Sequence, residues 1–295
     1  MKNRIIKRRK DSPMPVLFLM LLLLIPATVT PQSPLQFQYE KTITDFSNAN
    51  EFVISPMGDI YVIDEGVDQI LLLDTLGEVK RSSSGYGWEG AQMDNPLDVQ
   101  ASPLSVFVCD YGNNAIKEFD RGVNLLSVLK TNDGSTHFER PVSCAVSSFG
   151  ELYVLDSENK RIVKYDHQRN FTVAFAGFDF GEFALKDPLK VITTDGQTVF
   201  VLDKNRLLVF DSFGNGRSII PLPDGIKNIR YSGGKILFIS NDEVLAGTQM
   251  DTGLQVNKIK VSGLPEKRGD IESAVLYGGS LYLLYDTGLI VARSK

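Results

Sequence analysis

The feature that most constrains this chain is an internal repeat of about 46 residues. Four copies contain an apolar run closed by an aspartate, and these runs end at Asp64, Asp110, Asp156 and Asp203, spaced by 46, 46 and 47 residues. Two divergent copies follow, with Ser240 and Tyr285 at the closing position. A constant period of this length indicates a fold that repeats one supersecondary unit, here six times.

Each copy contains short β-rich runs separated by Gly, Asn and Asp. A proline opens the first run at Pro96, Pro141 and Pro188, and the second run ends at its aspartate. The third run ends in an Asp-x-x-Gly turn, as in Asp74–Gly77 and Asp211–Gly214, and a weaker fourth run follows. About 45 residues for four strands is the size of a β-propeller blade.

The pattern Pro-x-x-φ…Gly-x-φ-Tyr-Val-x-Asp…Asn-x-x-Ile-x-x-φ-Asp-x-x-Gly, with φ apolar, resembles the NHL repeat. The resemblance covers roughly residues 46–215 and is faint in the last two copies. It implies an all-β fold, a six-bladed β-propeller of TolB-like architecture with four-stranded antiparallel blades. The fifth copy is short, since Ser240 follows Asp203 by only 37 residues, and its outer strand is therefore in doubt.

The two ends of the repeat region complement each other. The last copy offers three runs, at 271–277, 281–285 and 289–293, while residues 36–43 alternate polar and apolar and belong to no copy. We predict that this N-terminal strand becomes the outermost strand of blade six. The pairing would remove an exposed strand edge and close the ring, so residues 35–43 should be ordered.

Residues 1–30 differ sharply from the rest. They carry six Lys or Arg and one Asp, followed by a ten-residue apolar run from Val16 to Ile25. The run is short against the roughly 20 residues that a membrane helix needs, so the segment is typical of a signal peptide or an N-terminal membrane anchor. We therefore expect residues 31–295 to form a single propeller domain outside the cytoplasm, in the periplasm, secreted or anchored, and to meet the membrane only through an uncleaved N-terminal segment.

Net charge and cysteine content bear on the possible partners and on a possible disulfide. The first thirty residues carry +5, so the net charge of −5 for the whole chain leaves −10 for residues 31–295, which argues against a nucleic-acid partner. Cys109 and Cys144 are the two cysteines. An exported protein can bridge them, but each lies in an apolar run where a free cysteine acts as a small hydrophobe, and both states stay open.

No catalytic constellation stands out. The aspartates at 64, 110, 156 and 203 are expected to accept backbone N–H bonds in the loops that follow them, in different blades and too far apart to share one ion. His137 and His167 are too few for a three-histidine zinc site, whereas a calcium site of carboxylates and Asn needs no histidine. We predict no catalytic, cofactor-binding or metal-binding residue and leave calcium open.

Topology indicates which surface could bind a partner. In a four-stranded antiparallel blade, the loops after the second and fourth strands emerge on the same face. The candidate residues on that face are Tyr86, Trp88, Tyr111, Asn113, Asn114, Arg161, Phe178, Phe180 and Arg206. Aromatic, Arg and Asn side chains are typical of recognition surfaces, although Trp88 and the phenylalanines could instead pack between blades.

Two functions follow as hypotheses. The first is an exported, non-catalytic binding or scaffold module for a protein or a cell-envelope component. The alternative is a calcium-dependent lactonase, esterase or lyase of the six-bladed propeller type, with ligands at the central channel. The fold alone does not choose between them.

Overall fold

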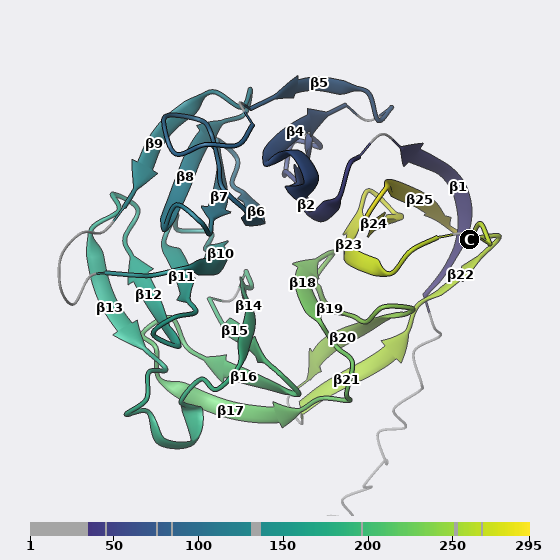
Figure 1. The fold of residues 1–295 in the computed structure, drawn as a ribbon. Coiled ribbons are helices and arrows are strands. Elements are labelled where there is room, and N and C mark those ends of the chain that lie inside the picture. The colour runs from purple at the N-terminus through teal and green to yellow at the C-terminus, as the bar shows by residue number, and fades with distance from the viewer. Residues whose placement is uncertain are drawn as a thin grey trace, which may run out of the picture. The chain divides into compact units, whose positions relative to one another are not determined.

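The computed structural model describes residues 35–295 apart from 45, 75, 84, 131–136, 196, 251–252 and 267. Residues 34–295 form one compact unit, in which six β-sheets are arranged as the blades of a ring (Figure 1). In this described part, no helix has both the length and the apolarity to cross a bilayer. The predicted signal peptide or anchor at residues 1–30 lies outside the described residues and stays a prediction.

Blades 1 to 5 each consist of four strands that pair antiparallel in chain order. Blade 1 contains β2 (Ala49–Ile54), β3 (Ile60–Asp64), β4 (Gln69–Leu73) and β5 (Val79–Ser82). Blade 2 contains β6 (Pro96–Ala101), β7 (Ser105–Asp110), β8 (Ala115–Asp120) and β9 (Leu125–Leu129). Blade 3 contains β10 (Pro141–Val146), β11 (Leu152–Asp156), β12 (Arg161–Tyr165) and β13 (Phe171–Phe175).

Blade 4 contains β14 (Pro188–Thr193), β15 (Val199–Asp203), β16 (Arg206–Phe210) and β17 (Gly216–Pro221). Blade 5 contains β18 (Asn228–Ser232), β19 (Lys235–Ile239), β20 (Val244–Met250) and β21 (Gly253–Lys258), so the doubtful outer strand is present. The single-turn 3₁₀ helices η1 (Glu65–Val67) and η3 (Gly181–Phe183) lie in loops of the described part. The all-β, six-bladed prediction is confirmed.

Blade 6 closes the ring as predicted. It contains β23 (Ile271–Tyr277), β24 (Ser280–Tyr285), β25 (Gly288–Ser294), β1 (Gln36–Thr44) and β22 (Lys260–Ser262). The N-terminal β1 pairs antiparallel with the C-terminal β25, from Phe37 opposite Ser294 to Thr44 opposite Gly288. The expectation that β1 would be the outermost strand was wrong, because the unpredicted β22 pairs parallel with the outer edge of β1.

Burial falls from the second strand of a blade to the fourth. Every residue of β3, β11 and β15 is buried, whereas every residue of β5 is exposed. The second strands are buried on both faces because neighbouring blades pack against each side. The apolar core is accordingly divided into six clusters, each formed by residues of two adjacent blades.

The Asp-x-x-Gly turns join the third and fourth strands of blades 1 and 4. The Asp74 carboxylate accepts the backbone N–H groups of Leu76 and Glu78, each at 2.9 Å. Gly77 adopts a φ of +94°, a conformation that disfavours any side chain. A Cβ there would also lie 2.5 Å from Ile43 of β1, so the glycine lets the turn approach the closing strand.

Candidate functional site

The innermost strand of each blade places one polar residue at the same position. In every blade this residue pairs with the one that precedes the closing residue of the second strand. The six residues are Glu51, Asp98, Ser143, Lys190, Asn228 and Ser273. Together with the nearby Arg230, they are called the channel layer. All seven are buried. In five of the six strands a register irregularity directly precedes the position, and such a bulge changes the direction of a side chain.

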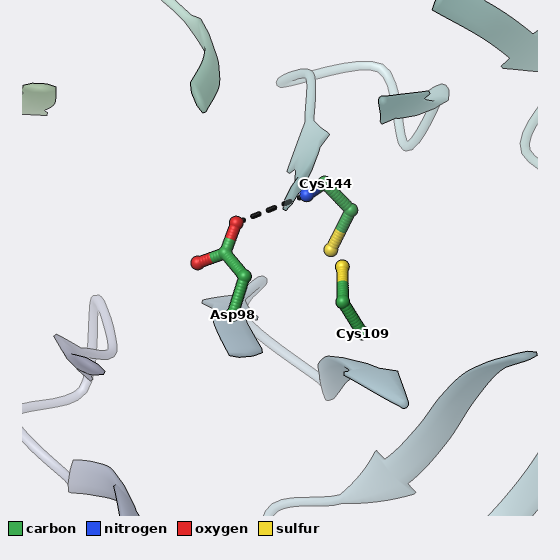
Figure 2. A group of neighbouring side chains, drawn as sticks. All are labelled: Asp98, Cys109 and Cys144. Carbon is green, nitrogen blue, oxygen red and sulfur yellow. Dashed lines mark hydrogen bonds between the residues drawn. The ribbon is translucent and has the colours of Figure 1, made fainter. Parts of the chain in front are cut away.

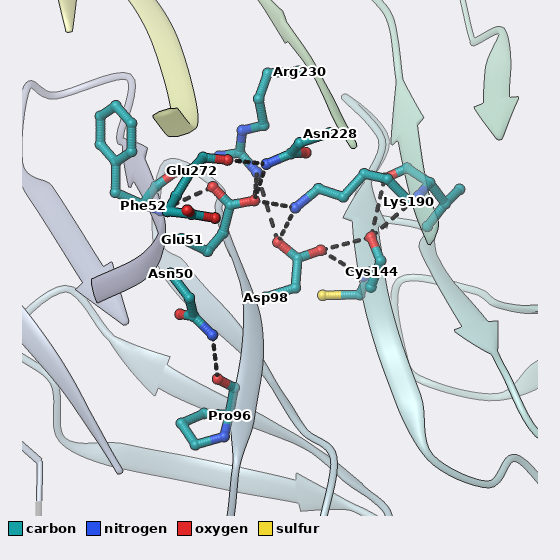
Figure 3. A network of polar contacts seen from close by, with 12 residues as sticks. Asn50, Glu51, Phe52, Pro96, Asp98, Cys144, Lys190, Asn228, Arg230 and Glu272 are labelled. Carbon is teal, nitrogen blue, oxygen red and sulfur yellow. Dashed lines mark hydrogen bonds and ion pairs between the residues drawn. The ribbon is translucent and has the colours of Figure 1, made fainter. Parts of the chain in front are cut away.

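Two cationic side chains hold two carboxylates in this layer (Figure 3). Lys190 Nζ forms ion pairs with Glu51 Oε2 and, at 2.7 Å, with Asp98 Oδ1. Arg230 Nη1 lies 3.6 Å from Asp98 Oδ1 and 3.8 Å from Glu51 Oε2, and Arg230 Nη2 donates to the Phe52 carbonyl at 2.7 Å. The four charged groups come from four different blades.

Two neutral members, Ser143 and Asn228, donate further hydrogen bonds to the carboxylates. Ser143 Oγ donates to Asp98 Oδ2 at 2.6 Å, and the backbone N–H of Cys144 donates to the same oxygen at 3.0 Å. Asn228 Nδ2 donates to Glu51 Oε2 at 3.0 Å. A buried charge is tolerated when it is paired and hydrogen-bonded, and Glu51 and Asp98 meet both conditions.

The electrostatics make the layer neutral. Burial by itself would raise the pKa of Glu51, but the positive charges of Arg230 and Lys190 outweigh burial and lower that pKa to about 2. Glu51 is therefore ionised at neutral pH. By formal charge, the two carboxylates of the layer equal its one ammonium and one guanidinium.

This arrangement does not fit a calcium ion. Calcium takes six to eight oxygen ligands and needs carboxylates that are free to turn toward it. In the channel layer, the ammonium of Lys190 and the guanidinium of Arg230 already lie beside both carboxylates. A divalent cation would meet two positive side chains, so we derive no chemistry through a channel metal.

Two cavities border the layer from opposite ends of the inner strands. One, of about 220 Å³, lies where the inner strands begin and is lined partly by Glu51 and Lys190. The other, of about 590 Å³, lies where they end and is lined partly by Arg230 and Leu104. We call the first side the loop face, which also carries the loops after Asp64 and its equivalents. The second is the hairpin face.

The closing aspartates bind backbone within their own blades. Asp64 accepts the N–H groups of Ser47 and Asn48 at 2.7 and 2.8 Å. Asp110, Asp156 and Asp203 likewise accept backbone N–H groups 16 or 17 residues upstream. We expected donors in the following loops, but among the described residues a backbone donor of that kind is found only at Asn159, which donates to Asp156 at 3.2 Å. Each aspartate therefore fastens the segment before the first strand to the end of the second.

The two arginines predicted at the partner-binding face, Arg161 and Arg206, bind two of these aspartates. Arg161 Nε lies 3.0 Å from Asp156 Oδ2, and Arg206 Nε lies 2.8 Å from Asp203 Oδ2. Their terminal nitrogens donate to carbonyl oxygens of the preceding blade-to-blade connections, such as that of Ala184 at 2.7 Å. Both guanidinium groups are engaged within the protein, which reduces what they can offer to a partner.

Three further predicted residues hold loops together. Asn113 Nδ2 donates to the Gly87 carbonyl at 2.9 Å, and Asn114 Oδ1 accepts the backbone N–H of Arg140 at 2.8 Å. The guanidinium of Arg140 lies 5.9 Å from the ring centroid of Tyr111, within the range of a cation–π contact. These contacts join the loop after β7 to the connections on either side of blade 2.

The predicted aromatics divide into two groups. Tyr86, Trp88 and Phe178, here called the exposed aromatics, are 62%, 68% and 95% exposed. Phe180 is partly buried and packs against the apolar cluster between blades 3 and 4. Packing between blades therefore describes Phe180 but not Trp88 or Phe178. The exposed aromatics lie on the connections from blade 1 to blade 2 and from blade 3 to blade 4.

The two histidines lie on opposite faces. His137 is on the connection before blade 3, and its Nε2 is 2.8 Å from Glu139 Oε1. His167 is in the turn between β12 and β13, on the hairpin face. The fold does not bring them together.

Sequence reasoning missed the channel layer. Its signal was present, because Asp98, Ser143 and Lys190 each follow a repeat proline by two residues and interrupt an otherwise apolar run. One polar residue within a strand does not by itself indicate that six such residues meet around one axis.

Comparison with known proteins supports the architecture. No protein-family model matches the chain, and no curated protein matches it, so the likeness to the NHL repeat rests on its motifs. The structure of a streptogramin B lyase is 12% identical with a TM-score of 0.61, covering 86% of this chain and 97% of that one. Catalytically inactive virginiamycin B lyase from Staphylococcus aureus, solved with quinupristin, is 11% identical with a TM-score of 0.59, covering 83% and 80%.

A protein of a different class is equally similar in fold. The WD40 repeats of RRP9 are 9% identical with a TM-score of 0.64, covering 88% of this chain and all of that one. Lyases and WD40 repeats thus share the architecture, and identities this low show the fold alone. The chain is a six-bladed β-propeller, and its function has to be argued from its own residues.

Proposed function

We propose that this chain is an exported, non-catalytic β-propeller that binds a protein or cell-envelope partner through its loop face. The exposed aromatics carry the proposal. Tyr and Trp are enriched at protein interfaces, and Phe178 is 95% exposed. An exposed aromatic on a connection contributes little to the fold and can contribute much to binding.

The channel layer supports the same proposal. Catalytic sites in a cleft need polar groups that are free to act on a substrate. Here the carboxylates of Glu51 and Asp98 are taken up by Lys190, Arg230 and Ser143. The paired carboxylates at the axis hold blades together, whereas Tyr86, Trp88 and Phe178 are exposed on the loop face.

The test is capture of the partner by the full chain in its own cells. Tagged wild type, the double variant Trp88→Glu with Phe178→Glu, and the control Phe213→Glu would be cross-linked and the adducts identified by mass spectrometry. Phe213 is 79% exposed in a turn of the hairpin face, which makes it a matched control. We expect one envelope species with wild type and control and its loss from the double variant. The same adducts with all three proteins would refute binding through this face.

Export is part of the proposal and has its own test. It rests on the basic segment and the ten-residue apolar run within residues 1–30. Cell fractionation should find the full chain outside the cytoplasm, and a variant lacking residues 1–30 should remain inside. Cytoplasmic full-length protein would contradict this part while leaving the binding surface to be tested separately.

The alternative is a calcium-dependent lactonase, esterase or lyase. The observation in its favour is the fold shared with streptogramin B and virginiamycin B lyases. Elemental analysis and melting curves with and without a chelator test it directly. Stoichiometric calcium, a large fall in melting temperature with chelator and turnover of a lactone or ester would together replace the binding proposal. A protein without calcium and without a chelator effect would retain it.

A further inference from the structure

Cys109 and Cys144 face each other across one interface between blades. Cys109 lies on β7 of blade 2 and Cys144 on β10 of blade 3, and both are fully buried. Their sulfur atoms lie within 4.8 Å of each other, and Figure 2 shows them turned toward one another. The cysteines are free thiols in this structure.

The same pair of positions recurs at all six interfaces of the ring. The first residue of each pair directly precedes the closing position of one blade. The second directly follows the channel-layer position of the next blade, and the two belong to the same apolar cluster. The pairs are Ile63–Val99, Cys109–Cys144, Leu155–Val191, Leu202–Ile229, Ile239–Ala274 and Leu284–Phe52. Five interfaces use two apolar side chains, and one uses both cysteines of the chain. The cysteines thus occupy matched positions as a pair.

A metal ion is a poor occupant of this place. Asp98 is close enough to make a third ligand, but it is bound by Lys190, Ser143 and the Cys144 N–H. Metal binding needs thiolates. Burial, followed by the contact with Cys144, raises the pKa of the Cys109 thiol well above its usual range, so the thiolate is disfavoured.

We propose that Cys109 and Cys144 form a disulfide that links blade 2 to blade 3. A sulfur–sulfur bond of about 2.05 Å forms as the two S–H bonds break, and a disulfide oxidant such as oxidised glutathione takes up both electrons and both protons and leaves as two thiols. Neither sulfur is accessible in the folded ring. The exchange therefore takes place while this interface is open, before the ring closes, and the bond is then shielded from reductants.

The experiment counts thiols after oxidative refolding. The protein is unfolded, refolded with reduced and oxidised glutathione, denatured again without reductant, and treated with a maleimide before its intact mass is measured. The disulfide predicts no maleimide adduct and a mass lower by two hydrogens. It also predicts a melting temperature higher by roughly 5–10 °C than that of the reduced, refolded protein, because the bond constrains the unfolded chain. Two adducts per chain, a glutathione adduct or a disulfide-linked dimer would overturn the proposal.

A double variant provides the control. Cys109→Leu with Cys144→Val installs the pair that the chain uses between blades 3 and 4, where Leu155 meets Val191. This variant should melt at the same temperature after either refolding protocol. An equal difference between protocols in wild type and variant would show that the stabilisation does not come from the cysteines. The adduct count on wild type decides the proposal even if the variant fails to fold.

Discussion

Two positions of the repeat differ in how much their residue type varies from blade to blade. The closing position of the second strand is aspartate in four blades, whereas the channel-layer position holds Glu, Asp, Ser, Lys, Asn and Ser in turn. The closing aspartates each bind backbone inside their own blade. The channel residues instead contact one another across blades, as Lys190 of blade 4 does with Glu51 of blade 1.

The difference teaches where a repeat protein has to break its own symmetry. A residue that interacts only with its own blade can be the same in every blade without destabilising the ring. A charged residue copied six times around a narrow axis would place like charges together in a medium where they are poorly screened. The channel layer avoids this with two carboxylates, two cations and neutral side chains. Its contacts should accordingly be cooperative, while those of the aspartate column should be independent.

The largest effect is expected at the channel. Lys190→Met leaves Glu51 and Asp98 buried with only the more distant Arg230, and breaking a buried ion pair in this way costs about 3–5 kcal/mol. Urea unfolding would measure the loss. Lys186→Met is the control, since Lys186 is exposed on the connection that leads into β14, the strand of Lys190, and it should change stability by less than about 0.5 kcal/mol. Equal effects of the two variants would show that the channel pairs contribute nothing.

The next effect is a dependence on acid. The folded pKa of Glu51 is about 2, below its ordinary 4.5, so its ion pairs stabilise the fold above pH 4.5 and are lost as the pH falls toward 2. The lowered pKa corresponds to roughly 3 kcal/mol. Unfolding free energies of wild type and Glu51→Gln should therefore converge over this window. A difference that stays constant from pH 6 to 2 would contradict the assignment.

The aspartate column should show smaller and independent effects. Asp203→Ala removes the acceptor for the backbone N–H groups of Lys186 and Asp187, at a cost of about 1–3 kcal/mol. Asp64→Ala likewise removes the acceptor for the backbone N–H groups of Ser47 and Asn48, and because the two aspartates lie in different blades their effects should add within about 0.5 kcal/mol. The pair Lys190→Met and Glu51→Gln should not add. Strong coupling between Asp64 and Asp203 would remove the distinction between the columns.

The smallest effect on stability is expected at the exposed aromatics. Phe178→Ala should change the free energy of unfolding by less than about 0.5 kcal/mol, since the side chain is 95% exposed. Phe180→Ala is the comparison, because Phe180 packs against the cluster between blades 3 and 4 and should cost more. Thermal melts of both variants would measure this. A loss at Phe178 as large as that at Phe180 would assign it a structural role.

Much of the fold was predictable because the repeat is visible as spacing. The apolar runs before Asp64, Asp110, Asp156 and Asp203 placed the second strands, and the alternation in residues 36–43 predicted the strand that closes blade 6. The short strand β22 was not predicted, because it has only three residues and is separated by one residue from β21, which ends at Lys258, so no turn residues in the sequence separate the two strands. The upstream donors of the aspartates were missed because local turn chemistry was assumed where a longer return of the chain supplies the N–H groups.

The candidate site was less predictable than the fold. The loop-face residues were identified from topology, but whether Arg161 and Arg206 are free or bound depends on the carbonyls that the neighbouring connection presents. The exposure of Trp88 and the burial of Phe180 likewise depend on the path that each connection takes from one blade to the next. The pattern of residues in a single sequence does not indicate those paths.

The sequence by itself determined the unit, its number and its closure, because hydrophobic alternation and turn residues act over a few positions and recur at a fixed period. Only the tertiary structure decided which polar residues meet. Glu51 and Lys190 are 139 residues apart and meet when the ring closes around a common axis, whereas Cys109 and Cys144 meet when blade 2 packs against blade 3. Long-range pairing of this kind follows from geometry that no local pattern encodes.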